Sequence, residues 1–435
     1  MKLYTECAEE IPHYTSQQLG KFININRIFS LIRKKKDISR ALLAKETSLT
    51  PTTVSMLVDE LCERGLVREK GTGRSATGRK PILLEVNPSG AMFPVLSLCT
   101  TGFLYTLYDL GLNILEKKFR PFPIAMPDPS VTTRQFIEKS VFSETALQLL
   151  KNDAKRIDWN LVPAMCFSYL GSFHWDTGTF SCTPLRAWTM TDFIHDIFVG
   201  IGKKPIFIEN GTVNIAYSEM NRLNPDADDF DFINIGEGVG VGRIENDHDN
   251  HTSQRKMLEL GHVTIEIDGR KCACGNRGCV ERYVNTNAIV RDIRSRIKGG
   301  ESSELLNLCR GDIERISLDT IRIALDNGDE MVKNALRYVA RCLSVAINNM
   351  ACILQTNRIA LGGGIERLGN VFLNYVREAL NDTSMKSLTQ KVEVTYVCSG
   401  EDSQSEGIVM QYIDDLMPDI LPATMASIAI YDIDN

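Results

Sequence analysis

The chain has 435 residues, of which 43% are hydrophobic and 24% are charged, and its net charge is -6. This composition is typical of a globular protein with two or three lobes, and the charge argues against a chain that coats nucleic acid. No apolar run approaches the roughly 18–20 residues of a membrane helix and no secretion signal is recognisable, so we expect a cytoplasmic protein.

Charge is distributed unevenly along the chain. Residues 1–90 contain 15 Lys/Arg and 10 Asp/Glu, whereas the rest of the chain contains 34 Lys/Arg and 45 Asp/Glu. A basic head therefore precedes an acidic body, a pattern that fits a protein whose N-terminal part contacts DNA.

An amphipathic helix is predicted over residues 19–32, where apolar side chains recur every three or four positions. The basic run Arg33-Lys34-Lys35-Lys36 follows it. These side chains either favour the negative end of the helix dipole or contact DNA phosphates, and both interpretations stay open at this point.

Two further helices are predicted after the first. One follows Ser39, and its inward-facing residues are expected to be Leu42, Leu43 and Ala44. The other opens with Thr50-Pro51, a hydroxyl able to cap a helix and a proline suited to the first turn.

The third helix has two distinct faces. Its apolar stripe consists of Val54, Leu57, Val58 and Leu61. The opposite face carries Thr52, Thr53, Ser55 and Met56. We predict that this second face contacts base edges in the major groove, as the N-terminal part of a recognition helix does.

A basic hairpin is predicted after the third helix. Residues 66–70 and 81–86 are expected to form two strands around a glycine-rich loop in which Arg74, Arg79 and Lys80 supply charge for phosphates or a narrow minor groove. Each feature alone is weak evidence, but their order on the basic segment predicts a winged helix-turn-helix DNA-binding domain over residues 17–88. The stretch from Ser39-Arg40-Ala41 to Lys80-Pro81-Ile82 resembles the winged helix of the repressor branch of the ROK family.

The body alternates predicted strands and helices, which indicates an α/β fold. Residues 95–98 and 103–111 are expected to form a hairpin, and residues 205–210 a strand that meets a helix. A strand at 230–235 runs into the glycine array 236–242. This array either cradles a phosphate or makes a tight turn between strands.

Cysteine spacing gives the strongest local signal in the body. Three of the 12 cysteines, Cys272, Cys274 and Cys279, fall within eight residues. In a reducing compartment such a cluster points to a metal rather than to disulfides. With His262 these thiolates would give structural Zn²⁺ four ligands and leave no open position for a reactive water. The alternative is three free thiols in a turn.

The motif around these cysteines carries a family resemblance. Glu-x-Gly-His at 259–262, followed by Cys-x-Cys-Gly-x-x-Gly-Cys-x-Glu at 272–281, resembles the zinc and sugar motif of the ROK family of sugar kinases and NagC/Mlc/XylR-type repressors. The resemblance implies an actin-like (ribonuclease H-like), two-lobed body of the sugar-kinase type. It further implies a small lobe at 89–210 with 408–435 and a large lobe at 211–407.

The resemblance also implies roles for single residues. The implied zinc ligands are His262, Cys272, Cys274 and Cys279. The implied sugar-binding residues are Glu259, His262 and Glu281, with Asn210 opposite them. A carboxylate suits this role because it accepts strong hydrogen bonds from two hydroxyls. For Glu281, an exposed loop carboxylate is the alternative interpretation.

Two kinase elements of the family are altered in this sequence. In the kinases an aspartate follows the asparagine matched by Asn210 and acts as the base, whereas this chain has Gly211. The nucleotide loop, matched by Leu98–Gly102, lacks the acidic residue that would help to hold Mg²⁺. Glycine can neither accept nor orient a proton, so we expect sugar binding without phosphoryl transfer, and no enzyme activity.

Together these features predict a sugar-responsive DNA-binding transcriptional regulator, a repressor of carbohydrate-utilisation genes. The expected partners are a double-stranded DNA operator, a sugar or sugar-phosphate effector, and further copies of the chain in a homodimer or tetramer. One alternative is an ATP-dependent sugar kinase with an accessory DNA-binding head. Another is a zinc-stabilised scaffold with neither ligand nor operator.

Overall fold

In the computed structural model the chain divides into two units: Met1–Asn214 with Gln404–Asn435 (unit 1), and Ile215–Ser403 (unit 2). The residues described are 2–4, 16–35, 37–72, 80–99, 102–122, 139–154, 156–174, 179–182, 185–223, 227, 229–247, 252–382, 392–397 and 402–415. No helix within these ranges is long and apolar enough to cross a membrane. The lobe boundaries predicted from the sequence stay a prediction.

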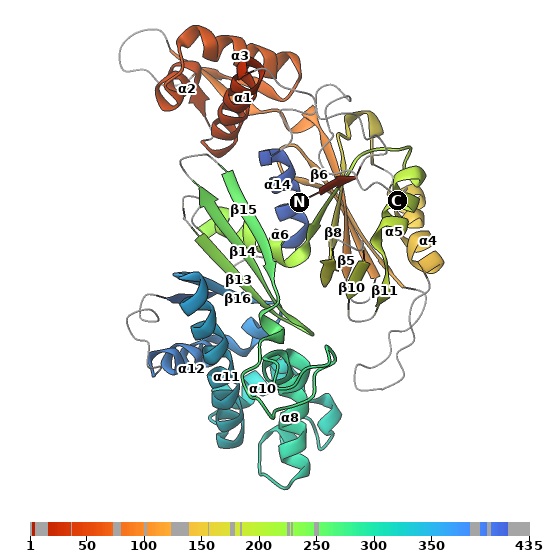
Figure 1. The fold of residues 1–435 in the computed structure, drawn as a ribbon, viewed down its shortest axis with the longest axis vertical. Helices are drawn as coiled ribbons and strands as arrows, with labels where there is room; N and C mark the ends of the chain where they lie inside the picture. Colours follow the sequence, from red (N-terminus) through yellow and green to blue (C-terminus); the bar gives the residue numbers. More distant parts are fainter. Residues whose placement is uncertain are drawn as a thin grey trace. The chain divides into compact units, whose positions relative to one another are not determined.

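The first part of unit 1 is a winged helix-turn-helix, as the sequence predicts (Figure 1). Its elements are α1 (Ser16–Lys34), β2 (Ile38–Ser39), α2 (Arg40–Thr47), α3 (Pro51–Glu63), β3 (Val67–Thr72) and β4 (Ile82–Val86). The strands form an antiparallel sheet in the order β2-β4-β3. Ser39 caps α2, and Thr50 Oγ1 accepts a hydrogen bond from the Thr53 N–H at 3.1 Å. Such local caps explain why the helix starts could be predicted from the sequence.

One inward-facing residue of α2 was predicted wrongly. Leu42 is 39% exposed, whereas Leu43 is fully buried. The helix has only eight residues and buries a single stripe, made by Leu43 and by Thr47 four positions later. Leu42 lies off that stripe because neighbouring residues point about 100° apart around a helix.

A six-stranded sheet forms the centre of the rest of unit 1. Its strands are β1 (Lys2–Tyr4), β5 (Met92–Cys99), β6 (Gly102–Asp109), β7 (Ile114–Pro121), β8 (Met165–Tyr169) and β12 (Ile206–Asn210). The order is β1-β12-β8-β5-β6-β7, in which β5, β8 and β12 are parallel and the predicted β5–β6 hairpin is antiparallel. Every residue of β8 and β12 is buried, as in parallel strands covered on both faces.

Unit 2 contains a five-stranded sheet of the same design. Its strands are β13 (Asp229–Ile235), β14 (Val239–Asp247), β15 (Thr252–Leu258), β16 (Arg358–Gly362) and β17 (Glu393–Tyr396). The order β15-β14-β13-β16-β17 matches β7-β6-β5-β8-β12 of unit 1, with three antiparallel strands followed by two parallel ones. The two similar sheets confirm the actin-like α/β body predicted from the sequence.

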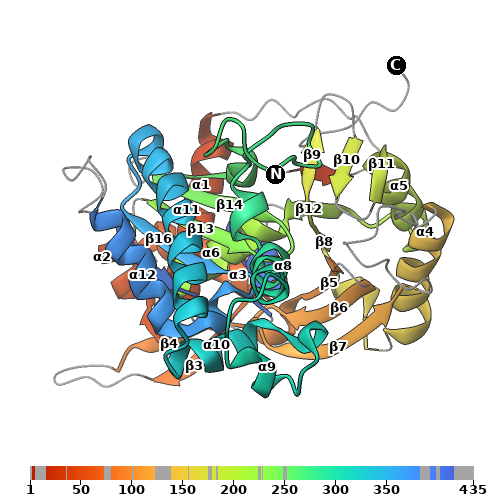
Figure 2. The same cartoon turned by 90° about the horizontal axis from the view of Figure 1, so that it is seen from below.

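Helices and short strands complete both units (Figure 2). In unit 1 they include α4 (Lys139–Gln148), α5 (Met190–Gly200), β9 (Ser172–His174), β10 (Thr179–Cys182), β11 (Leu185–Thr189), α14 (Ser403–Asp415), a π-helical turn at Leu149–Asp153 and 3-10 turns at Pro88–Gly90 and Trp159–Leu161. Helix α6 (Gly211–Leu223) begins in unit 1 and continues into unit 2. In unit 2 they are α7 (Glu281–Val284), α8 (Thr286–Lys298), α9 (Leu305–Leu308), α10 (Leu318–Asp326), α11 (Glu330–Leu354), α12 (Gly369–Asn381) and 3-10 turns at Leu260–His262, Ile313–Arg315 and Ile365–Leu368.

Residues 236–238 of the glycine array form a turn between strands, and residues 239–242 belong to β14. Asn234 pairs with Gly240 and Ile235 with Val239, and the Gly236 N–H donates to the Gly238 carbonyl at 3.0 Å. Of the two interpretations left open by the sequence, the structure contains the tight β13–β14 hairpin.

One hydrophobic cluster joins the winged helix to the sheet of unit 1. Its members include Phe29, Ile32, Val54, Leu57, Val58, Leu61, Phe93, Phe207, Ile408, Val409, Tyr412 and Ile413, which come from α1, α3, β5, β12 and α14. The ring of Tyr412 packs edge-on against Phe93 and Phe207, with centroids 5.7 and 5.5 Å away. Residues of α14 and of the winged helix thus belong to one core. Because packed side chains resist independent movement, the two parts are mechanically connected.

Candidate functional site

The loop over residues 259–281 carries the predicted metal motif, and local contacts fold it back on itself. Thr264 pairs with Cys279 across an antiparallel bridge. Gly278 has φ +69°, and a Cβ at this residue would lie 1.6 Å from the Glu266 carbonyl oxygen. Only glycine fits here, so a residue within the motif itself allows the loop to close.

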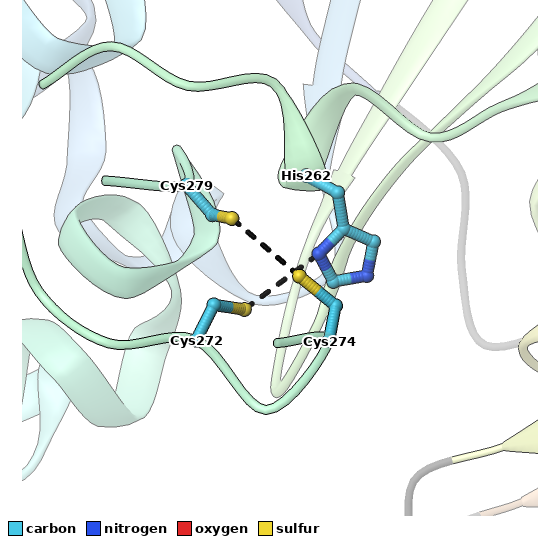
Figure 3. A group of neighbouring side chains, drawn as sticks. All are labelled: His262, Cys272, Cys274 and Cys279. Atoms are coloured by element: carbon cyan, nitrogen blue, oxygen red, sulfur yellow. Dashed lines mark hydrogen bonds between the residues drawn. The ribbon is translucent and has the colours of Figure 1, made fainter. Parts of the chain in front are cut away.

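Four side chains of this loop converge on one point (Figure 3). The ligand atoms of His262, Cys272, Cys274 and Cys279 all lie within 4.8 Å of one another. Cys272 Sγ is 3.7 Å from His262 Nδ1, and Cys274 Sγ is 3.7 Å from Cys279 Sγ. An ion bound tetrahedrally at about 2.3 Å from sulfur would hold its sulfur ligands about 3.8 Å apart. These four residues could therefore hold a metal ion.

The thiols of this cluster differ in their environments. Cys272 and Cys279 are buried, whereas Cys274 is exposed. Burial and, second, hydrogen bonds with the neighbouring thiols raise the pKa of Cys279 to about 12. A hydrogen bond from the Asn276 backbone lowers the pKa of Cys274. A divalent cation at the centre would offset the cost of the buried thiolate, because it attracts all three sulfurs.

The residues of unit 2 predicted to bind sugar lie at the two ends of this loop. Glu259 is exposed and His262 half-buried, and the His262 N–H donates to the Glu259 carbonyl at 3.0 Å. One ring nitrogen of His262 faces the cysteines and the other points away from them (Figure 3). Glu281 is half-buried, and its Oε2 accepts a hydrogen bond from the Val239 N–H at 3.1 Å. Glu281 is thus held against the glycine turn, and its sugar-binding role stays a prediction.

The fourth predicted sugar-binding residue, Asn210, ends β12 in unit 1 and is 1% exposed. Its Nδ2 donates to the Gly171 carbonyl at 2.8 Å, and its Oδ1 accepts from the Thr212 N–H at 2.7 Å. Both ends of the amide therefore have partners within the protein. These contacts position the start of α6, and the predicted contact between Asn210 and a sugar is untested.

The space beside Gly211 is occupied by a residue that sequence reasoning missed. A Cβ at residue 211 would lie 2.7 Å from Gln404 Nε2 and 2.9 Å from its Cδ. Gln404 Nε2 donates to Ser168 Oγ at 2.9 Å. No motif around residue 404 predicts this contact, because Gly211 and Gln404 are almost two hundred positions apart in the sequence.

The segment matched to the nucleotide loop joins two strands of unit 1. Cys99 ends β5, Gly102 begins β6, and the two residues face each other in the antiparallel pair. Leu98 is 2% exposed. Thr100 and Thr101 lie outside the described residues.

The predicted recognition face of α3 is at the protein surface. Met56 is 55% exposed and Thr52 is exposed, whereas Thr53 and Ser55 are half-buried. Lys80, after the wing, is also exposed. Arg74 and Arg79 lie outside the described residues.

The basic run at the end of α1 has protein partners. Arg33 forms an ion pair with Asp414 of α14, and both side chains are 13% exposed. Lys35 Nζ lies 2.8 Å from Glu46 Oε1 of α2. These ion pairs give Arg33 and Lys35 a structural role that neither interpretation of the sequence included, and both interpretations stay predictions.

Two family models match the chain. The model of the ROK family matches residues 101–410, and a model of winged helix-turn-helix DNA-binding domains matches residues 23–68. The second match covers α2 and α3, which agrees with the DNA-binding domain predicted for the head.

Named relatives align with most of the chain. The xylose repressor of Caldicellulosiruptor bescii is 25% identical over 386 residues, which cover 87% of this chain and 92% of that protein. The DNA-binding transcriptional dual regulator NagC of Escherichia coli is 23% identical over 380 residues, or 86% and 89%. The xylose repressor of Bacillus subtilis is 24% identical over 406 residues, or 92% and 97%.

Solved structures share the fold. A ROK family transcriptional regulator, described as a homolog of the E. coli MLC protein, superimposes with a TM-score of 0.74 at 22% identity, covering 91% of this chain and 97% of that one. A ROK family glucokinase from Streptomyces griseus, in complex with glucose and AMPPNP, superimposes with a TM-score of 0.58 at 19% identity. The match covers 74% of this chain and 99% of that one. At these identities the likeness concerns architecture, and it agrees with the two repeated sheets.

Proposed function

We propose that this chain, which belongs to the ROK family, is a sugar-responsive DNA-binding transcriptional repressor. The observation that carries the proposal is a winged helix with an exposed recognition face, fused to a ROK body that has glycine at residue 211. The relatives named as xylose repressor and as transcriptional regulator NagC support the same function.

The head would bind DNA through α3 and the wing. Thr52 and Met56 present a hydroxyl and an apolar side chain, which suit hydrogen bonds to base edges and contact with a thymine methyl. Thr53 and Ser55 would complete the base-reading face, and Arg74, Arg79 and Lys80 would contact phosphates or the minor groove.

The body would bind a sugar without phosphorylating it. Phosphoryl transfer needs a group that accepts or orients the proton of the attacking hydroxyl, and glycine at 211 supplies none. The amide of Gln404 lies beside this position and is a poor base. Glu259, His262 and Glu281, with Asn210, are our candidates for bonds to the sugar hydroxyls. The names of the relatives make D-xylose and N-acetylglucosamine the first sugars to test.

The metal loop would hold a structural zinc ion. Three sulfurs and one histidine nitrogen are the donors that zinc prefers, and the separations of 3.7 Å support tetrahedral binding. With all four positions filled by His262, Cys272, Cys274 and Cys279, the ion would keep the loop closed and orient His262. Glu281 ends this loop two positions after Cys279, so the metal would also fix the position of its carboxylate.

We further propose that the chain works as a homodimer or tetramer in the cytoplasm. Two winged helices related by twofold symmetry would contact operator half-sites about 34–36 Å apart, or multiples of that distance. A repressor of this kind recognises a palindromic operator, since the symmetry of the DNA site reflects that of the protein.

A selection experiment tests the function directly. Purified full-length protein is mixed with sheared genomic DNA at physiological salt, and bound fragments are sequenced and then challenged with D-xylose, N-acetylglucosamine, glucose and their phosphate esters. We expect specific fragments to bind about 1,000-fold or more tightly than random DNA, and one sugar to release them. Binding at the non-specific level only, or no effect of any sugar, would contradict the proposal.

The kinase alternative has its own assay. The fold likeness to a glucokinase is the observation in its favour. ADP release is measured with the same sugars, ATP and Mg²⁺, and we expect no turnover above the protein-free rate. Sugar-dependent ADP release that follows the protein through purification would establish the kinase instead.

A further inference from the structure

Gln404, in the first turn of α14, occupies the space that a side chain at residue 211 would need. The three atoms nearest to a Cβ at Gly211 all belong to Gln404, at 2.7, 2.9 and 3.3 Å. Any residue other than glycine at 211 therefore requires Gln404 to move. The reverse also holds, since glycine at 211 is what allows the amide to lie there.

This contact lies where ligands bind in α/β proteins. Residues 168 and 210 are near the carboxyl ends of β8 and β12, which run parallel and are neighbours in the sheet. Ligands of parallel sheets bind outside these ends. Gln404 is half-buried here, and its amide can both donate to and accept from a sugar hydroxyl.

A polar network fixes the amide relative to α6. Ser168 Oγ, which is fully buried, receives hydrogen bonds from Gln404 Nε2 at 2.9 Å and from Asn214 Nδ2 at 2.7 Å. Gln411, two turns further along α14, donates to Asn214 Oδ1 at 2.8 Å. A displacement of Gln404 therefore changes the bonds that hold α14 to the start of α6.

The two helices also touch along their backbones. A Cβ at Gly407 would lie 1.9 Å from the Asn214 carbonyl oxygen, so the helices approach too closely for any side chain there. Beside it, Ser405 Oγ lies 2.8 Å from the hydroxyl of Tyr108 on β6. Tight packing of this kind transmits small shifts instead of absorbing them.

The other end of α14 is fastened to the winged helix. Asp414 forms the ion pair with Arg33 at the end of α1, and both side chains are largely buried. Tyr412 and Ile413 belong to the cluster that includes the apolar stripe of α3. One helix of 13 residues thus contacts the 210–211 turn at its start and the DNA-binding head at its end.

We propose that Gln404 is the effector-sensing residue of unit 1 and that α14 carries its displacement to the winged helix. A polyhydroxylated, uncharged sugar that bonds the amide would pull it away from Ser168 and shift α14. The ion pair between Arg33 and Asp414 would pass this shift to α1. This inference rests on the proposed function and names the residues through which the repressor would respond.

A substitution that adds a side chain at residue 211 tests the sensing step. Gly211→Ala forces Gln404 aside without any sugar, so we expect its affinity for a selected genomic fragment to change roughly tenfold, in the direction that the sugar causes in the wild type. The double variant Gly211→Ala/Gln404→Ala has no amide to displace, and sugar should change its DNA affinity less than about twofold. DNA affinity is measured by fluorescence anisotropy, with circular dichroism as the check on folding. A folded Gly211→Ala variant with wild-type affinity and response would overturn the proposal.

A change at the other end of α14 tests the connection. Asp414→Asn should bind the releasing sugar with the wild-type Kd in calorimetry, yet show less than about half of the wild-type change in DNA affinity. The exchanged pair Arg33→Asp/Asp414→Arg should restore the response, because it restores the ion pair. A wild-type response in Asp414→Asn, or no recovery in the exchanged pair when it folds, would show that the helix does not carry the signal.

Hydrogen exchange separates this inference from the proposed function, because it needs neither DNA nor sugar. Gly211→Ala should raise amide exchange in α1 by about fivefold or more if α14 connects the two ends. Unchanged exchange in α1 overturns the connection even when the wild-type protein is a sugar-released repressor. If the wild type selects no DNA, the proposed function fails on that result alone, whatever the exchange data show.

Discussion

The 259–281 loop of unit 2 and the 210–211 turn of unit 1 match the ROK motifs to different degrees. The loop has four residues that could bind a metal, whose ligand atoms lie within 4.8 Å of one another, and a glycine at residue 278 where no other residue fits. The turn retains Asn210 but has glycine at 211, and the space beside it is filled by Gln404 from the far end of the chain.

This difference follows from what each region requires. A tetrahedral metal site needs every ligand, because a three-ligand site leaves an open position and binds more weakly. At the turn, the space beside residue 211 has to be filled and the buried polar groups have to be hydrogen-bonded. Any polar side chain that reaches this space can meet both requirements. The loop is therefore specified by nearby residues, whereas the turn is completed by a distant one.

The largest effect is expected from removing a proposed metal ligand. Cys274→Ser deletes one of four ligands, and we expect it to lower the free energy of unfolding by about 4 kcal/mol and to abolish the sugar response. Cys352→Ser, at another exposed cysteine, should change it by less than about 0.5 kcal/mol. Denaturant unfolding and metal analysis measure both. Equal stabilities for the two variants would mean that the loop holds no structural metal.

The next effect separates steric fit from backbone strain within the loop. Gly278→Ala places a Cβ against the Glu266 carbonyl at positive φ, and should cost about 3 kcal/mol. Gly275 also has positive φ, +96°, but has nothing within 4 Å of its Cβ position, so Gly275→Ala should cost only about 1 kcal/mol. Thermal unfolding in the presence of Zn²⁺ measures the difference. If Gly275→Ala were the more damaging change, the close approach to Glu266 would not be what fixes the loop.

A third prediction concerns the refilled turn. Gly211→Asp should cost about 1.5 kcal/mol, because its side chain displaces the amide of Gln404 from its hydrogen bond to Ser168. Adding Gln404→Ala should recover most of this loss, which a double-mutant cycle reports as a coupling of about 1 kcal/mol or more. Additive effects of the two substitutions would show that Gln404 does not occupy this space.

The smallest expected change in stability is at Glu281. Glu281→Ala removes the bond to the Val239 N–H, with an expected cost of about 1 kcal/mol, and should also abolish sugar binding in calorimetry. Glu301→Ala breaks an exposed ion pair with Arg296 and should cost less than about 0.5 kcal/mol, with unchanged sugar binding. Retained sugar affinity in Glu281→Ala would restrict this carboxylate to a structural role.

Most of the head could be predicted because its signals are local. Thr50 and Pro51 start α3, and the stripe from Val54 to Leu61 buries one face of it. The role of Arg33 could not be predicted, since its partner Asp414 follows 381 positions later. The sequence around the basic run fits an interaction with the helix dipole and a phosphate contact equally well.

The sequence by itself determined the winged helix, the α/β character of the body and the four residues that we propose as metal ligands. In each case the residues that interact are close in the chain, so helix caps, hydrophobic periodicity and ligand spacing in the sequence predict the feature. The tertiary structure decided what fills the space beside Gly211 and what holds the end of α1. Both answers lie on α14, because only the packed chain brings residues 404 and 414 to their partners.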